Sequence, residues 1–176
     1  LVGARVAVLE DGVPQAGGRW GADHGVLLDA ALYDGVEAVP GGGHVWLGPE
    51  AMGGAIRLAS MGLLEADGTR TQSGMQYRAG DAAARFHVLH RSRKGPLQWH
   101  AGWSLSRHAN RNVAQSSFEY IGRQFELSTP RLPNTSGRGM HGVLGLRLSG
   151  ADGDWGTVEW RFGQVSQGLS PGIIGI

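Results

Sequence analysis

The sequence has no cysteine, few charges and no long apolar run, and each absence removes a class of protein. Without cysteine among its 176 residues, the chain has no disulfide framework, no thiolate zinc site and no cysteine nucleophile. Charged residues make up 18% and the formal net charge is +1, which is too balanced for a protein that binds nucleic acid through its charge. Charged residues interrupt every apolar run well before the ~18 residues of a membrane helix, so strands would have to make any membrane contact.

Glycine is what the sequence has in excess. The 31 glycines and 7 prolines make up about a fifth of the chain, against a usual ~12%, which argues against a helical bundle. The sequence begins at Leu1 and ends in PGIIGI, and neither end resembles a signal peptide or a domain edge. We therefore expect it to be a piece of a longer protein.

The first part of the chain, residues 1–65, predicts a small domain rich in turns. Its short apolar runs, ARVAVL, VWLG and AIRLAS, are separated by clusters of glycine and are interpreted as strands. One helical turn is expected in DAALYDG, with Asp29 as its N-cap and Gly35 closing it.

The second part, residues 66–176, alternates between apolar and polar positions, the pattern of strands with two unlike faces. The alternation is clearest at 97–108, where one face carries Leu97, Trp99, Ala101, Trp103 and Leu105, and the other carries Gln98, His100, Gly102, Ser104, Ser106 and His108. It recurs at 140–149 and 157–163, and less cleanly at about 70–79 and 83–92.

The connections between these segments differ in length. AGD (79–81), RKGP (93–96) and GADGD (150–154) predict hairpin turns, whereas 109–139 predicts a loop of some thirty residues. Short turns at one end of the sheet, long loops at the other and strands of ~10 residues are typical of an outer-membrane β-barrel. A soluble β-sandwich gives the same alternation, but tryptophan on several apolar faces, opposite polar faces suited to a wet lumen, favours the barrel.

Two ordered motifs carry a family resemblance. Residues 36–60 read VEAVPGGGHVWLGPEAMGGAIRLAS and 6–14 read VAVLEDGVP; this resembles the plug domain of TonB-dependent outer-membrane receptors. The family pattern has D-G-V-P, then I-E-V-x-R-G-P, then Y-G-x-x-A-x-G-G-x-I-N-I. The positions of this sequence that match it include Asp11, Gly12, Pro14, Val36, Glu37, Gly41, Gly48, Ala51, Gly53, Gly54 and Ile56. It departs from the pattern at Pro40, Gly42, Leu47 and Arg57, which places any contact made by the usual arginine in doubt.

The motif residues also have a physical interpretation without the family. Asp11-Gly12 is a tight-turn pair, because glycine tolerates positive φ and aspartate can bond its own backbone. Gly48-Pro49 and Gly53-Gly54 remove side chains where the backbone bends or closely approaches another segment. These residues are predicted to be structural, not catalytic.

The resemblance implies a mainly β fold in two pieces. Residues 1–65 would be the C-terminal part of a plug domain (small α+β), and 66–176 the first strands of an incomplete transmembrane β-barrel. A 22-stranded barrel needs ~220 residues in strands alone, so this chain would supply roughly the first five strands. The energy-coupling box of the family would precede Leu1.

The function implied is transport, not catalysis, and no cofactor is expected. Such a receptor lies in the outer membrane of a Gram-negative bacterium, in contact with its lipid, and takes up a scarce nutrient such as a siderophore-type metal chelate, cobalamin or a glycan. The TonB protein would act on it at the periplasmic face. The ligand-facing candidates lie in the 109–139 loop and are Arg111, Asn112, Tyr120, Arg123 and Arg131.

Other chemistry finds little support. His87 and His90 would point to opposite faces of a strand, and His100 and His108 would stand ~26 Å apart along one, so no metal site is predicted. The sequence has neither a P-loop nor a nucleophile elbow.

The alternative function is a soluble glycine-rich β-sandwich that binds carbohydrate, with tryptophans stacking on sugars. Trp99, Trp103 and Trp160 separate the two readings. They point outward to lipid in a barrel, and lie in the core or a concave groove in a sandwich.

Overall fold

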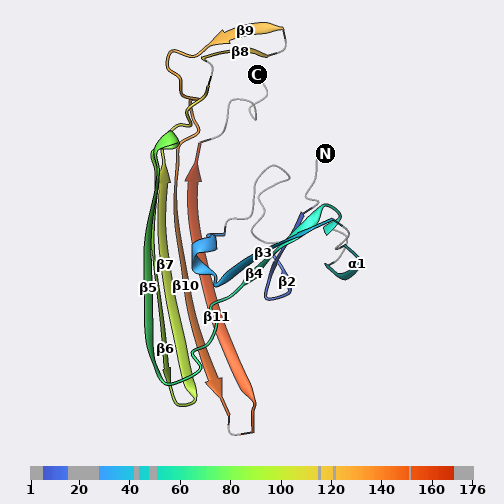
Figure 1. The fold of residues 1–176 in the computed structure, drawn as a ribbon, viewed down its shortest axis with the longest axis vertical. Helices are drawn as coiled ribbons and strands as arrows, with labels where there is room; N and C mark the ends of the chain where they lie inside the picture. Colours follow the sequence, from blue (N-terminus) through green and yellow to red (C-terminus); the bar gives the residue numbers. More distant parts are fainter. Residues whose placement is uncertain are drawn as a thin grey trace.

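The computed structural model describes residues 6–15, 28–41, 44–47, 51–114, 116–120, 122–150 and 152–168. These form a four-stranded sheet, a five-stranded sheet and a two-stranded hairpin (Figure 1). The short helical elements are η1 (Ala30–Leu32), α1 (His44–Leu47) and η3 (Ala79–Asp81). None of the described helices has the length and apolar character needed to span a membrane.

The four-stranded sheet has the order β2-β1-β4-β3. Its strands are β1 (Val6–Glu10), β2 (Val13–Pro14), β3 (Gly35–Pro40) and β4 (Gly54–Ala59), with β1 parallel and β3 antiparallel to β4. Asp11 and Gly12 form the two-residue turn between β1 and β2, with φ of 47° and 86°, because such a hairpin turn needs two positive φ angles. Its small core consists of Ala7, Leu9, Ala51 and Ala55, against which Val39 and Leu47 pack.

Two details of the first part differ from the prediction. Asp29 does cap a helical turn, accepting a hydrogen bond from the Ala31 N–H, but η1 ends at Leu32 with Tyr33 as its C-cap, and Gly35 begins β3 instead of closing the helix. The run VWLG was expected to be a strand, yet Val45–Leu47 belong to α1. Periodicity cannot separate a strand from a helical turn in so short an apolar run.

The five-stranded sheet is an antiparallel meander in the order β11-β10-β7-β6-β5. Its long strands are β5 (Gly68–Arg78), β6 (Ala83–Lys94), β7 (Leu97–His108), β10 (Gly137–Ser149) and β11 (Trp155–Gln167). In the described residues β5 and β11 are its open edges, and it does not close on itself. The predicted fold class, mainly β with an incomplete barrel wall, is confirmed.

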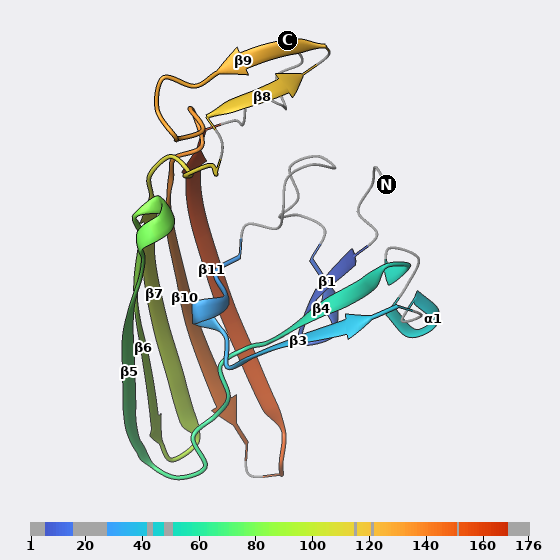
Figure 2. The ribbon, with the colours of Figure 1, turned by 45° about the horizontal axis from the view of Figure 1, so that its top comes forward.

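The two faces of this sheet follow the predicted alternation. The four-stranded sheet and η1 lie on one side of it (Figure 2), where Leu32 and Met61 pack on Leu89 and Val143. The strand register places Trp99, Trp103 and Trp160 on the opposite face, where they are 39%, 40% and 62% exposed. They are therefore neither a sandwich core nor part of the contact with the four-stranded sheet.

Glycine makes the close contact with η1 possible. A Cβ atom at Gly102 would lie 2.8 Å from the Leu89 side chain, 2.9 Å from Val143 and 3.2 Å from Leu32. Because these distances are shorter than ordinary van der Waals contact, a larger residue at this position would require the side chains of Leu89, Val143 and Leu32 to shift.

The connections require two further corrections. The segment 109–139 is not a plain loop, since it contains the hairpin β8 (Ser117–Tyr120) and β9 (Arg123–Glu126), and β10 begins within it. The 79–81 turn does not share an end with the other short turns. It lies beside the long connection, where the Ala109 N–H donates to the Asp81 carbonyl at 2.8 Å. Successive connections in a meander lie at alternate ends of the sheet. The first connection, at 79–81, must therefore lie at the same end as the third, which is the long one.

Candidate functional site

The contact between the two sheets is polar, and we call it the interface network. It joins the four-stranded sheet and its connections to the facing side of the five-stranded sheet at three places. Its members are Glu10, Asp29, Tyr33, Asp34, Ser60 and Gly62 on the first side, and Arg85, Arg91, His100, Ser104, Glu159 and Arg161 on the second.

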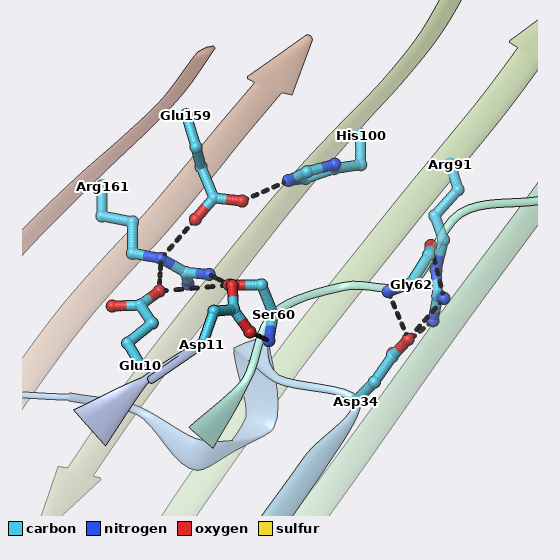
Figure 3. Close-up of polar contacts among 9 residues, drawn as sticks. All are labelled: Glu10, Asp11, Asp34, Ser60, Gly62, Arg91, His100, Glu159 and Arg161. Carbon is cyan, nitrogen blue, oxygen red and sulfur yellow. Dashed lines mark hydrogen bonds and ion pairs between the residues drawn. The ribbon is translucent and has the colours of Figure 1, made fainter. Parts of the chain in front are cut away.

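Arg161 on β11 is the centre of the first place (Figure 3). Its Nε contacts the carboxylate of Glu10 and lies 2.7 Å from Glu159 Oε1, and its Nη2 donates to Ser60 Oγ at 3.0 Å. Glu159 also contacts His100 Nε2 at 2.9 Å. The Arg161 guanidinium thus links β11 to the end of β1 and to the chain after β4, and Glu159 extends the cluster across β10 to His100 on β7.

Tyr33 closes this cluster from the side of η1. The Arg161 guanidinium carbon lies 4.3 Å from the centre of the Tyr33 ring, within the range of a cation–π contact. Burial raises the pKa of Tyr33 to about 12, against the opposing effect of Arg161. The phenol therefore remains neutral throughout the physiological range, and it adds no negative charge to the two carboxylates nearby.

Arg91 on β6 forms the second place. Its two terminal nitrogens donate to the two carboxylate oxygens of Asp34 at 2.6 and 2.7 Å, the bidentate geometry that gives the strongest arginine–carboxylate pairs. The Gly62 N–H donates to the same carboxylate at 2.6 Å, and the Gly62 carbonyl accepts from Arg91 at 3.2 Å (Figure 3). Arg91 thereby joins β6 to the residue before β3 and to the chain that follows β4.

Asp29, the N-cap of η1, forms the third place. Its side chain is 2% exposed; it accepts from Ser104 Oγ at 2.6 Å and from the Ala31 N–H at 3.0 Å, and it lies 3.5 Å from Arg85 Nη1. Burial by itself would raise the pKa of Asp29, but the hydrogen bonds from Ser104 and Ala31 and the charge of Arg85 outweigh it and lower that pKa. Asp29 is therefore a buried carboxylate that keeps its charge.

The composition of the interface indicates what it can do chemically. In the described residues its apolar part is a cluster of four buried residues. Most of its polar groups are paired in charged hydrogen bonds, except that the Tyr33 hydroxyl and Arg91 Nε are buried without a hydrogen-bond partner. Water can replace hydrogen bonds of this kind, so the net cost of separating them is about 1 kcal/mol each, or 1.5–3 for charged groups. Such an interface fixes the position of the small sheet mainly through polar contacts that water can also satisfy.

The motif residues of the first part occupy turns and strand pairs. Besides forming the hairpin turn, Asp11 accepts a hydrogen bond from the Ser60 N–H at 3.0 Å. Pro14 in β2 is the register partner of Leu9 in β1. Glu37 pairs with Arg57 across β3 and β4 at 3.1 Å, in solvent. Gly41 and Gly54 have φ of 60° and 123°, and a Cβ at Gly54 would lie 2.5 Å from the Val39 carbonyl oxygen. Gly53 is in the turn before β4, and Gly48 lies outside the described residues.

The loop candidates are brought together in pairs. Asn112 and Arg131 form an isolated antiparallel bridge, and the Arg111 carbonyl accepts from the Leu132 N–H at 2.8 Å. Tyr120 and Arg123 are backbone partners at the tip of the β8–β9 hairpin. The side chains of Arg111, Asn112, Arg123 and Arg131 are exposed, and whether they bind a ligand stays a prediction.

Sequence reasoning missed most of the interface network. Asp29 was predicted only as a helix cap, and Glu10, Asp34, Arg91 and Arg161 were not singled out. A usable signal existed for the two arginines, because both fall on the polar side of an alternating strand. In the described part of the chain no three histidine or acidic side chains cluster as metal ligands.

Comparisons with known proteins bear on the fold. No protein-family model matches the sequence, and no curated protein matches it either. Among solved structures, the FrpB iron transporter from Neisseria meningitidis (F3-3 variant) is similar, with a TM-score of 0.68 and 13% identity over 92% of this chain and 24% of that one. The apoprotein form of the F5-1 variant gives 0.60 and 13% over the same shares. This chain spans about a quarter of the length of those transporters, and at this identity the likeness establishes a shared fold.

Proposed function

We propose that this chain is part of a TonB-dependent outer-membrane receptor that takes up a scarce nutrient. Residues 1–65 are the C-terminal part of its plug, and residues 66–176 are the first strands of its barrel. The main support is the contrast between the two faces of the five-stranded sheet: one is polar and covered by the four-stranded sheet, and the other is apolar and exposed. A barrel that holds a plug and stands in lipid needs this arrangement.

The interface network fits the mechanism that the family resemblance implies. Ligand bound outside is signalled to the periplasmic face, where TonB pulls on the plug. Contacts at Arg161, Arg91 and Asp29 hold the plug before that force acts, and each exchanges with water when it does. Transport then needs no cofactor and no catalytic residue.

The long connection and the 79–81 turn would face the outside, and the short turns at 95–96 and 150–154 would face the periplasm, as in barrels of this kind. Arg111, Asn112, Tyr120, Arg123 and Arg131 are then candidates for contact with the nutrient. Between a metal chelate, cobalamin and a glycan, the names of the two similar structures, both iron transporters, favour a metal chelate.

Uptake by the complete protein tests this function. It is expressed in a Gram-negative host without its own receptors, with and without TonB, and supplied with ferric chelates, cobalamin and oligosaccharides. We expect uptake of one of these classes only when TonB is present. Uptake that persists without TonB contradicts the proposal, as does a protein that fractionates with the soluble proteins of the cell.

The absence of cysteine from the chain allows a direct test of plug movement. Asp29→Cys and Ser104→Cys together place thiols on two side chains that are in direct contact in the native protein, where Ser104 Oγ lies 2.6 Å from Asp29 Oδ2. Joining the thiols with a disulfide or a short bifunctional reagent should stop uptake, and reduction of the disulfide should restore it. Each single cysteine variant is the control, and full uptake by the joined form would show that the plug need not leave the wall here.

A further inference from the structure

The outward face of the five-stranded sheet carries formal charge only at its two ends. The register pairs place 29 residues of the five long strands on this face. Among these described residues, the charged ones are Lys94, Arg107 and Arg138. Lys94 lies at the end of the short turns, and the two arginines lie at the end of the long connection. No acidic side chain accompanies either group on this face.

The two arginines stand directly opposite each other. Arg107 on β7 is the register partner of Arg138 on β10, both are exposed, and within the described residues neither has an acidic partner for its guanidinium. Directly opposite residues have Cβ atoms ~4.5–5.5 Å apart, and like charges in that position destabilise a sheet. An anion bound between the arginines would remove this repulsion.

A groove extends from the arginines into the apolar part of the same face. It has a volume of about 430 Å³. Its lining includes four apolar side chains beside Arg107 and Arg138, which are Met75, Phe86, Leu105 and Met140. Gln164 and Ser166 on β11 border it with polar groups. The groove therefore offers a doubly cationic end and an apolar floor, which fits an anionic group attached to a hydrocarbon chain.

The position of the arginines fits a membrane boundary. The apolar positions of β7 extend from Leu105 to Leu97. This stretch is about 26 Å long at ~3.3 Å per residue. A strand tilted by about 40° would cover about 20 Å of the membrane normal with it. The apolar band of an outer-membrane barrel is ~25 Å tall. Arg107 and Arg138 thus lie just beyond the band, at the level of the lipid headgroups.

We propose that Arg107 and Arg138 bind the phosphate of a membrane lipid, whose acyl chain lies in the groove below. The inference rests on the proposed function, because it requires this face to stand in lipid. Arginine suits this role, since its planar guanidinium donates two parallel hydrogen bonds to phosphate oxygens.

Quenching of tryptophan fluorescence by brominated lipids tests the site in the complete protein reconstituted in vesicles. Trp99, Trp103 and Trp160 lie on this face, and quenching by brominated phosphatidylcholine reports whether they meet acyl chains at all. Brominated phosphatidic acid, which carries a phosphate monoester, then reports headgroup preference. We expect phosphatidic acid to bind at least about fivefold more tightly than phosphatidylcholine, since one arginine near an anionic surface contributes on the order of a fivefold preference.

Two variants locate the preference. Arg107→Gln combined with Arg138→Gln should bring the ratio of the two affinities, phosphatidic acid over phosphatidylcholine, close to one. It should leave quenching by phosphatidylcholine unchanged. Arg70→Gln removes one positive charge from an exposed residue on the opposite face and should leave the ratio as it is. Inorganic phosphate at millimolar concentration should not compete, because it lacks the acyl chain.

Each contrary result has a distinct meaning. A ratio near one in the unaltered protein, or a ratio that survives the double substitution, overturns the lipid site while the receptor function stands. Competition by inorganic phosphate would also overturn it, since the site would then take a soluble anion. Absence of quenching by any brominated lipid contradicts the proposed function itself, because the outward face would not meet lipid.

Discussion

The two faces of the five-stranded sheet are built by the same strands and have opposite chemistry. One face carries Arg91, Ser104 and Arg161, which are paired with side chains of the η1 segment and of β1. The other face carries tryptophan and leucine side chains that remain 38–62% exposed. In a water-soluble protein the apolar face would be the one covered. The reversal supports the proposal that the outward face meets lipid, with polar protein on the other side.

Arg161→Met should give the largest loss, because it removes the cation at the centre of the interface network. Glu10 and Glu159, whose side chains are 11% and 21% exposed, would lose that partner, and breaking such a pair typically costs about 3–5 kcal/mol. Chemical unfolding of the complete protein in detergent measures the change. Arg161→Lys, which keeps the charge but not the planar fork, should lose less. A loss below about 1 kcal/mol for Arg161→Met would mean that water already screens the cluster.

Leu144→Arg tests the outward face. Leu144 is 53% exposed near the middle of the apolar rows, and an arginine at the midplane of a barrel in lipid costs about 2–4 kcal/mol. Folding in lipid vesicles, compared with the Leu144→Ala variant, separates the added charge from the lost apolar surface. Equal stability of the two variants in vesicles would contradict a lipid-facing position.

Asp29→Ala removes a helix cap and the hydrogen bond from Ser104 together. A cap is worth ~0.5–2 kcal/mol, and the unsatisfied Ser104 hydroxyl adds to this, so we expect a loss of about 2–3 kcal/mol. Asp29→Asn retains the cap and should recover about half of that loss. If both variants instead lose the same free energy of unfolding, the charge of Asp29 stabilises the protein and its hydrogen bond to the Ala31 N–H does not.

The same residue gives the interface a pH dependence of definite sign. The pKa of Asp29 in the folded protein is below its ordinary value of 3.8. Its contribution is therefore fully present above that value and is lost as the pH falls through the lower, folded-state pKa. Between pH 7 and pH 3 the unaltered protein should lose more stability than Asp29→Asn, in which the other carboxylates still titrate, and an equal loss in the two would contradict this contribution.

Asp81 should respond to acid locally, at the end of the long connection. The hydrogen bond from Arg78, and its charge, lower the pKa of Asp81 to about 2. Its contribution to the 79–81 turn is therefore complete above its ordinary pKa of 3.8 and decreases as the pH falls from there toward 2. Hydrogen exchange at the Ala109 N–H, which is bonded to the Asp81 carbonyl, should become faster over that range. The Asp81→Asn variant should exchange at one rate throughout after correction for intrinsic chemistry.

Arg57→Ala should have the smallest effect. Its pair with Glu37 joins two side chains that are 53% and 62% exposed, and exposed ion pairs contribute about 0–1 kcal/mol. Unfolding in high salt, which screens such pairs, should leave the variant and the unaltered protein indistinguishable. A larger loss would mean that Arg57 contacts a part of the protein beyond this chain.

The sequence was most informative where one local rule decides the structure. Alternation predicted which face of β7, β10 and β11 each side chain takes, because successive residues of a strand point to opposite sides. Asp11-Gly12 predicted a tight turn for an equally local reason. The run VWLG was misjudged, since four apolar residues fit a strand or a helical turn equally well, and the hairpin inside 109–139 carried too weak a pattern to be seen.

The interface network was outside the reach of such rules. Asp29 and Ser104 are 75 residues apart and Glu10 and Arg161 still farther, so no window of sequence contains both partners. Local pattern by itself determined the strands, their two faces and the turn at Asp11-Gly12. Only the tertiary structure decided which polar groups meet, because a charge stays buried at low cost only where the fold brings an opposite charge or a hydrogen-bond donor to it.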